Sequence, residues 1–235
     1  MGLILRIDVD KPYGRSTFIE KIKSKLKEDY YFPQIDLFGY LKSNESLLKF
    51  CNKNKVKGIF YFRNCTTPNT KNLNLIKRGG QSIGFHAENT RDYLTFEAEL
   101  NLFKNKIGNV SLHSFTKHGS GEIKIGKHHY PKYEPENYKE WAPKVNVPYY
   151  YGNEICESAN DFLNSTLFYP KMFWIHEEYR DSKLNKIKDI IELAKHTDVP
   201  IIIHPANFTA NKQVNSDFKE LVRLAKKESI SWIIP

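Results

Sequence analysis

The sequence predicts an α/β fold in which about seven to eight mainly parallel strands wind into a regular or distorted (β/α) barrel. Segments with strand character and segments with helix character alternate along the whole chain. The strand segments are continuous apolar runs rich in Ile, Phe and Val, which is typical of a parallel sheet that is covered on both faces. Right-handed connections between successive parallel strands would wind such a sheet into a barrel.

The first half of the chain begins with a short buried strand over residues 3–7, and the carboxylates Asp8 and Asp10 follow it. Pro12 follows it and cannot continue a central strand. A long polar stretch then contains a possible helix at 16–27. Apolar spacing predicts the next elements as helix 44–53, strand 57–62, helix 69–78 with a glycine pair after it, and strand 82–86.

The clearest helix of the sequence is expected after Asp92, a residue type that caps helix N-termini. Its apolar residues are spaced 3, 4, 3 and 4 along the chain, at positions 93, 96, 100, 103 and 107. The later elements are expected as strand 110–115, helix 135–142, strand 147–151, a strand within 167–174, helix 184–194, strand 199–203, helix 218–225 and strand 230–234. Because the sequence has no internal repeat or low-complexity linker, residues 1–235 are expected to form a single domain.

The composition limits which classes of binding partner and which cellular compartment are expected. The formal net charge of +9 favours acidic partners, but the lysines are scattered and no nucleic-acid-binding motif is present, so dedicated nucleic-acid binding is not expected. Three widely separated cysteines predict neither a disulfide framework nor a zinc knuckle. The N-terminus lacks a signal peptide, and no apolar run reaches the roughly 18 residues of a membrane span. We therefore expect no transmembrane segment and a cytoplasmic location.

Polar residues suited to chemistry gather at the ends of the predicted strands. In chain order they are Asp8, Asp10, His86, Lys117, His118 and His204. The carboxyl ends of the strands of a parallel barrel all lie on one face, where the loops build the active site. Carboxylates and imidazoles are both metal ligands and general acids or bases. The sequence therefore predicts a metal site with an acid and a base on that face.

Three motifs resemble those of the polysaccharide deacetylases, the NodB-homology or carbohydrate esterase family 4 group, in their order and spacing: I-D-V-D at 7–10, I-G-F-H at 83–86 and I-H-P at 203–205. The resemblance implies a distorted or incomplete (β/α) barrel. It also implies that Asp8 is the general base and His204 the general acid. Asp10 and His86 would bind a divalent metal, with zinc as the expected ion.

The sequence departs from the family pattern at one metal ligand. The family usually has a second metal histidine four residues after the first, where this chain has Thr90. His118 is the best substitute; alternatively, Thr90 or a water molecule that it holds completes the metal shell. The basic residue that orients the base could be Lys117, with Arg91 as another candidate. These departures indicate a divergent branch, similar to sugar deacetylases of surface-polysaccharide biosynthesis.

The expected activity is metal-dependent removal of an N-acetyl or similar acyl group from a sugar or glycan precursor. The candidate substrate contacts are Arg91, Ser120 and Trp174. Backbone N–H groups around Ser120 could hold an oxyanion, and Trp174 could lie under the apolar face of a pyranose. Two alternatives remain: a catalytically lapsed carbohydrate-binding protein of the same fold, suggested by Thr90, and a small-molecule amidohydrolase.

Overall fold

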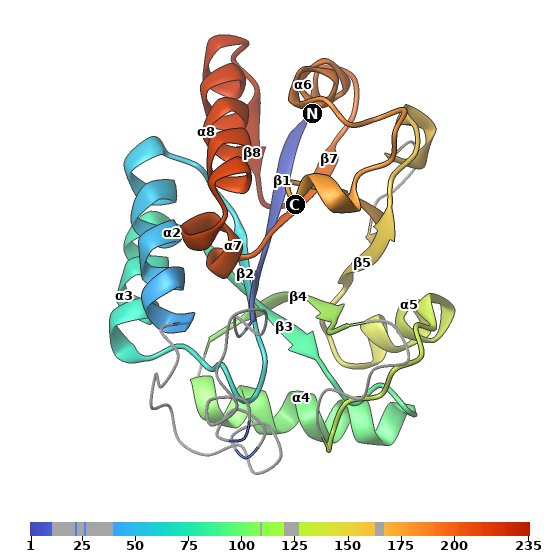
Figure 1. Cartoon of the computed structure of the whole chain (residues 1–235). Helices are drawn as coiled ribbons and strands as arrows, with labels where there is room; N and C mark the ends of the chain where they lie inside the picture. Colours follow the sequence, from blue (N-terminus) through green and yellow to red (C-terminus); the bar gives the residue numbers. More distant parts are fainter. Residues whose placement is uncertain (11–21, 23–25, 27–39, 109, 120–126, 163–166) are drawn as a thin grey trace.

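Figure 1 shows the computed structural model, which describes residues 1–10, 22, 26, 40–108, 110–119, 127–162 and 167–235. The helix expected at 16–27 lies outside the described residues except at positions 22 and 26, and Ser120 also lies outside them. Within the described residues, most strands are followed by a helix, as the sequence predicts.

The strands of the described part are β1 (Gly2–Val9), β2 (Ile59–Phe62), β3 (Ser82–Ala87), β4 (Leu112–Lys117), β5 (Tyr149–Ile155), β6 (Phe168–Trp174), β7 (Val199–Ile203) and β8 (Ser231–Ile233). The helices are α2 (Tyr40–Asn54), α3 (Thr70–Gly79), α4 (Tyr93–Ile107), α5 (Pro135–Lys144), α6 (Ile187–Ala194), α7 (Pro205–Ala210) and α8 (Lys212–Lys227), with short 3₁₀ turns η1 (Ala159–Phe162) and η2 (Glu177–Tyr179). No described helix has the length and apolar character of a bilayer-crossing segment.

Strands β1 to β7 form a closed parallel ring. They pair in the order β2-β3-β4-β5-β6-β7-β1, and a further pairing between β1 and β2 closes the ring. Each of these ladders is parallel. The register shifts between β3 and β4 and again between β5 and β6, so the ring is distorted. The fold is therefore the (β/α) barrel that the sequence predicts.

Strand β1 is forked along one of its edges. Its first residues, Gly2–Ile4, pair with β8, whereas its last residues, Arg6–Val9, pair with β2. The other edge pairs with β7. β8 is thus an additional strand outside the ring, and it shares one edge of β1 with β2.

The side chains of β1 alternate between the helix layer and the inside of the barrel. Leu3, Leu5 and Ile7 belong to the large apolar core that also includes buried helix residues. Ile4 belongs to a smaller cluster whose buried members all come from strands. Because side chains two apart on a strand point to the same face, Arg6 and Asp8 also face inward. Both are buried, so the barrel interior contains an ionisable pair.

Helix α4 follows the sequence prediction at both ends. The side chain of Asp92 accepts a hydrogen bond from the backbone N–H of Thr95 at 2.8 Å, and a reciprocal bond completes a capping box. Phe96 and Phe103 of this helix pack against the ring of Phe85 on β3. The loop between β3 and α4 is therefore fixed at both of its ends.

Candidate metal centre

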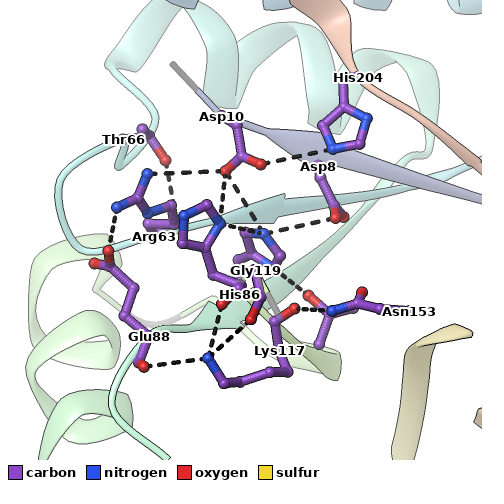
Figure 2. A network of polar contacts seen from close by, with 12 residues as sticks. Asp8, Asp10, Arg63, Thr66, His86, Glu88, Lys117, Gly119, Asn153 and His204 are labelled. Atoms are coloured by element: carbon purple, nitrogen blue, oxygen red, sulfur yellow. Dashed lines mark hydrogen bonds and ion pairs between the residues drawn. The ribbon is translucent and has the colours of Figure 1, made fainter. Parts of the chain in front are cut away.

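Polar side chains from several strands meet at one mouth of the barrel, as Figure 2 shows. They are Asp8 in β1, Asp10 just after β1, His86 in β3, His118 just after β4 and His204 just after β7. The backbone N–H of His118 donates to the carbonyl of Ala87 at 2.7 Å, which holds the end of β4 beside the end of β3. The parallel ring therefore brings together residues that lie far apart in the sequence.

Asp10, His86 and His118 form a compact group of three possible metal ligands. Nδ1 of His118 lies 3.1 Å from Nε2 of His86. Oδ1 of Asp10 lies 3.3 Å from the first nitrogen and 3.6 Å from the second. This carboxylate oxygen is buried and has no hydrogen-bond partner among the described residues. A cation between these three atoms would satisfy them all, so the donor set fits a divalent metal.

The protonation states favour the same interpretation. Burial, followed by the charge of Arg63, lowers the pKa of His118 to about 4, so its imidazole is neutral near pH 7 and can bind a metal. Burial opposes the ionisation of Asp10, but His118 and His86 outweigh it and hold the pKa of Asp10 well below its usual value. The other ring nitrogen of His86, Nδ1, is hydrogen-bonded to the hydroxyl of Thr116. Such a partner fixes the ring orientation of a metal-binding histidine.

Asp8 lies beside this group and is held by Arg6. Its Oδ1 accepts a hydrogen bond from Nε of Arg6 at 2.8 Å, and its Oδ2 accepts one from Nη2 at 2.5 Å. The guanidinium also donates to the backbone oxygen of Tyr151 and to Oδ1 of Asn153. Burial raises the pKa of Asp8, but the charges of Arg6 and His86 together with the hydrogen bonds from Arg6 outweigh burial and leave this pKa below its usual value. Asp8 is therefore an oriented, ionised carboxylate.

The three other residues considered from the sequence make different contacts. Nζ of Lys117 donates to the backbone oxygen of His118 at 2.7 Å and to that of Gly119 at 3.2 Å, so it braces the loop after β4, whereas Arg6 makes the contact to Asp8. Arg91 is exposed before α4, next to Asp92. The hydroxyl of Thr90 lies 3.2 Å from that of Tyr138.

His204 closes the side of the site nearest to solvent. Its Nε2 lies 3.6 Å from Oδ2 of Asp10, and its side chain is 22% exposed. Trp174, at the end of β6, stacks on the His204 ring with 5.9 Å between ring centroids. Tyr179 packs against Trp174 at 5.1 Å and is itself exposed. The aromatic residues thus flank the imidazole on the accessible side.

Sequence reasoning missed two buried arginines. Arg6 could have been found, because a residue two positions before Asp8 on a strand faces the same way. Arg63 follows β2, and its Nη1 lies 4.0 Å from Oδ1 of Asp10. Its Nη2 pairs with the carboxylate of Glu88, which follows β3 (Figure 2). The positions of Arg63 and Glu88 directly after strands are a usable signal, but the sequence offers no way to rank these two residues above other charged residues.

The fold and the site together define a class: a parallel (β/α) barrel whose mouth holds an Asp/His group able to bind a metal, with a second Asp and a third His beside it. No family model matches the sequence, and the search of curated proteins found no match.

Two solved structures are similar to this chain. One is a protein of Parabacteroides distasonis, assigned only provisionally as a glycoside hydrolase/deacetylase, with a TM-score of 0.50, 9% identity, and coverage of 97% of this chain and 67% of that chain. The other is the Xyl-CE4 domain of a multidomain xylanase from the hindgut metagenome of Trinervitermes trinervoides, with a TM-score of 0.41, 15% identity, and coverage of 98% and 92%. The first likeness shows a shared fold, in agreement with the family resemblance in the sequence motifs.

Proposed function

We propose that this chain, as one catalytic domain over residues 1–235, is a metal-dependent hydrolase. It removes an N-acetyl or similar acyl group from a sugar or surface-polysaccharide precursor. The observation that carries the proposal is the buried Oδ1 of Asp10, which has no hydrogen-bond partner in the described part of the chain and faces Nε2 of His86 and Nδ1 of His118. This donor set lies next to a carboxylate that has its own cation, Arg6.

Asp10, His86 and His118 are the proposed metal ligands. Two imidazoles and one carboxylate are a frequent ligand set for catalytic zinc, which keeps a further position open. Bound there, a zinc ion would lower the pKa of water and polarise the acyl carbonyl. The low pKa of His118, which burial and then Arg63 produce, keeps its lone pair available for this role.

Asp8 is the proposed general base. Arg6 engages both of its oxygens, so its carboxylate is ionised and fixed in direction. Its Oδ2 lies 3.6 Å from Nε2 of His86, which puts it at the edge of the ligand group. From this position Asp8 can accept the proton of the attacking water while Arg6 holds it in place.

His204 is the proposed general acid. Burial lowers its pKa, and the charges of Asp8 and Asp10 oppose this effect. Its protonated form is therefore a stronger acid than an exposed imidazolium, which suits donation to a leaving amine. The stacked ring of Trp174 restricts the orientation of the imidazole.

The substrate is proposed to lie on the accessible side, where Trp174 and Tyr179 can contact the apolar face of a pyranose. Arg91 and Ser120 remain proposed contacts from the sequence. His118 lies close to His86 and can supply the imidazole ligand that is missing at position 90, where this chain has Thr90. This arrangement supports an active metal centre over a lapsed carbohydrate-binding protein. A small-molecule amidohydrolase would use the same centre with another substrate.

The proposal is tested by measuring acetate released from a panel of N-acetylated mono- and oligosaccharides by the zinc-loaded protein. We expect release by the wild type and loss of release after chelation. Asp8→Asn should abolish turnover and keep the metal, because the amide cannot accept the proton. Thr90→Val is the matched control and should retain activity.

Three outcomes would contradict this assignment. Full activity of Asp8→Asn would remove the base from its role. Sugar binding without acetate release would favour a lapsed binding protein, and release from non-sugar amides alone would favour the amidohydrolase.

A further inference from the structure

The end of the barrel opposite the candidate metal centre contains a pocket at the fork of β1. Trp232 of β8 pairs in register with Leu3, near the start of β1, whereas Asp8 is near the other end of that strand. β8 and β2 share one edge of β1 at successive positions. The ends of α2 and α8 that precede these two strands lie at the same end of the molecule (Figure 1). The two helices border the pocket.

The pocket has a volume of about 580 Å³, which is in the size range of small-molecule sites. The described part of its lining combines apolar residues with basic ones and contains no carboxylate: Phe50, Lys53, Asn54, Lys55, Lys219, Val222, Arg223, Lys226, Ile230 and Trp232. Phe50, Ile230 and Trp232 pack on the main core and are only partly buried. The pocket therefore offers an apolar floor with aromatic rings and a cationic rim.

The rim carries a positive charge that the described residues neutralise only in part. Arg223 is paired through two hydrogen bonds with Glu220. By contrast, the four rim lysines are exposed and have no ion-pair partner among the described residues: Lys53, Lys55, Lys219 and Lys226. The C-terminal ends of α2 and α8 contribute only partial negative charge, equivalent to about half an electron each. The net potential at the rim is therefore positive.

We propose that this pocket binds a nucleotide, with the base on the apolar floor and the phosphates at the rim. A half-buried tryptophan provides a stacking surface for a base, and ammonium groups are suitable partners for phosphate. A bare phosphate would leave the apolar floor unused. A concave site of this volume suits one molecule better than a membrane surface or an extended polymer.

The test is equilibrium dialysis or calorimetry at low ionic strength with UDP, ADP and inorganic pyrophosphate as probes. The wild type should bind a nucleoside diphosphate at least tenfold more tightly than pyrophosphate. The double variant Lys219→Gln/Lys226→Gln should weaken nucleotide binding at least tenfold. Its matched control is Lys183→Gln/Lys212→Gln, which removes two exposed lysines outside the pocket and should stay within about twofold of the wild type.

Trp232→Leu separates the contribution of the floor from that of the rim. It keeps an apolar side chain, so nucleotide binding should weaken towards that of pyrophosphate while pyrophosphate binding stays unchanged. If Trp232→Leu does not fold, the two double lysine variants still decide the test, because their substitutions are at exposed positions and should not disturb folding.

The proposal is overturned if neither nucleotide binds at millimolar concentration, or if both double lysine variants behave alike. It is also overturned if pyrophosphate binds as tightly as the nucleotides. Binding of single-stranded homopolymeric RNA far more tightly than UDP, with steep loss in salt, would overturn it in favour of a polymer site.

Discussion

Arg6 and Asp8 are the residues on which the proposed proton transfer most depends. A buried carboxylate is normally disfavoured in its charged form, and opposite charges and hydrogen bonds to the charged form reverse this preference. Arg6 supplies both to Asp8 through its bidentate contact, and His86 adds to the charge effect. The backbone oxygen of Tyr151 and the side chain of Asn153 hold the guanidinium. Removing the cation altogether, as in Arg6→Met, should destabilise the fold by about 3–5 kcal/mol, because it leaves an unpaired buried charge.

Arg6→Lys is the more informative substitution. It keeps the positive charge and loses the two parallel hydrogen bonds. The charge of the Asp8 carboxylate is then still balanced, but the carboxylate is no longer oriented. We expect kcat to fall roughly 10- to 100-fold, with KM and zinc content unchanged, measured by steady-state kinetics and elemental analysis. Arg78→Lys, an exposed change on α3, is the control. An unchanged kcat would show that Arg6 has only a structural role.

At the scale of elements, α4 depends on its N-terminal cap. The Asp92 side chain accepts from the backbone N–H of Thr95, and the capping box also includes the Thr95 hydroxyl. Asp92→Ala should cost about 1 kcal/mol, seen as a lower free energy of unfolding in urea. Asn101→Ala, at an exposed position of the same helix, should cause no loss. Equal stability of both variants would contradict the role of the cap.

The loop between β3 and α4 is tied to α4 by a buried carboxylate. Glu99 of α4 accepts hydrogen bonds from the backbone N–H groups of Glu88 and Asn89, at 3.1 and 2.8 Å. Burial, and then the charge of Glu88, raises the pKa of Glu99 from 4.5 to about 8. The folded chain therefore binds one more proton than the unfolded chain between these two values.

Stability should accordingly fall as pH rises from about 4.5 to about 8, because ionisation of Glu99 is resisted only in the folded state. Glu99→Gln removes this titration and should flatten the slope of unfolding free energy against pH in that window. Urea unfolding at several pH values measures the effect. Glu97→Gln, on the same helix, is the control. A slope unchanged by Glu99→Gln would contradict the assigned pKa.

The elements that the sequence predicts most accurately are those with strong local signals. Residues 93–107 have a helical apolar period and follow a capping residue, and residues 199–203 form an unbroken apolar run. The bounds of both predicted elements match the structure. Helix α7 was missed, because six residues are too few to show a period. Helix α8 begins at Lys212, before the first apolar residue that marked it in the sequence. Weakly apolar first turns give no periodic signal.

At the scale of the whole molecule, the parallel ring explains how distant residues share one site. All carboxyl ends of the ring strands face the same mouth, so strand-end position selects Asp8, Asp10, His86, Lys117, His118 and His204 as a group. Which cation meets Asp8 depends instead on side-chain direction across the ring. The sequence offers Lys117 and Arg91 as candidates, but Nζ of Lys117 reaches the loop carbonyls after β4 and Arg91 is exposed before α4. The spacing of Arg6 and Asp8 along β1 indicates only that the two side chains share a face, and does not by itself rank Arg6 above the other cations.

The two ends of the barrel have different proposed roles. The mouth combines ionisable side chains from β1, β3, β4 and β7, while the opposite end presents the basic pocket beside β8. Because the two sites share none of the described residues, loss of nucleotide binding and loss of the proposed deacetylase activity should be separable by mutation. A metal bound only by the folded chain should also raise its thermal stability, and above the Kd this gain should grow with the logarithm of the metal concentration.

The most direct test of the proposed metal centre is the zinc content of His118→Ala, determined by elemental analysis after unbound zinc has been removed by dialysis. The distances in the mouth predict stoichiometric zinc in the wild type and in Thr90→Val, and its loss in His118→Ala and Asp10→Asn. Circular dichroism would verify that each variant is folded. Stoichiometric zinc in folded His118→Ala, together with its loss in Thr90→Val, would contradict the proposed centre.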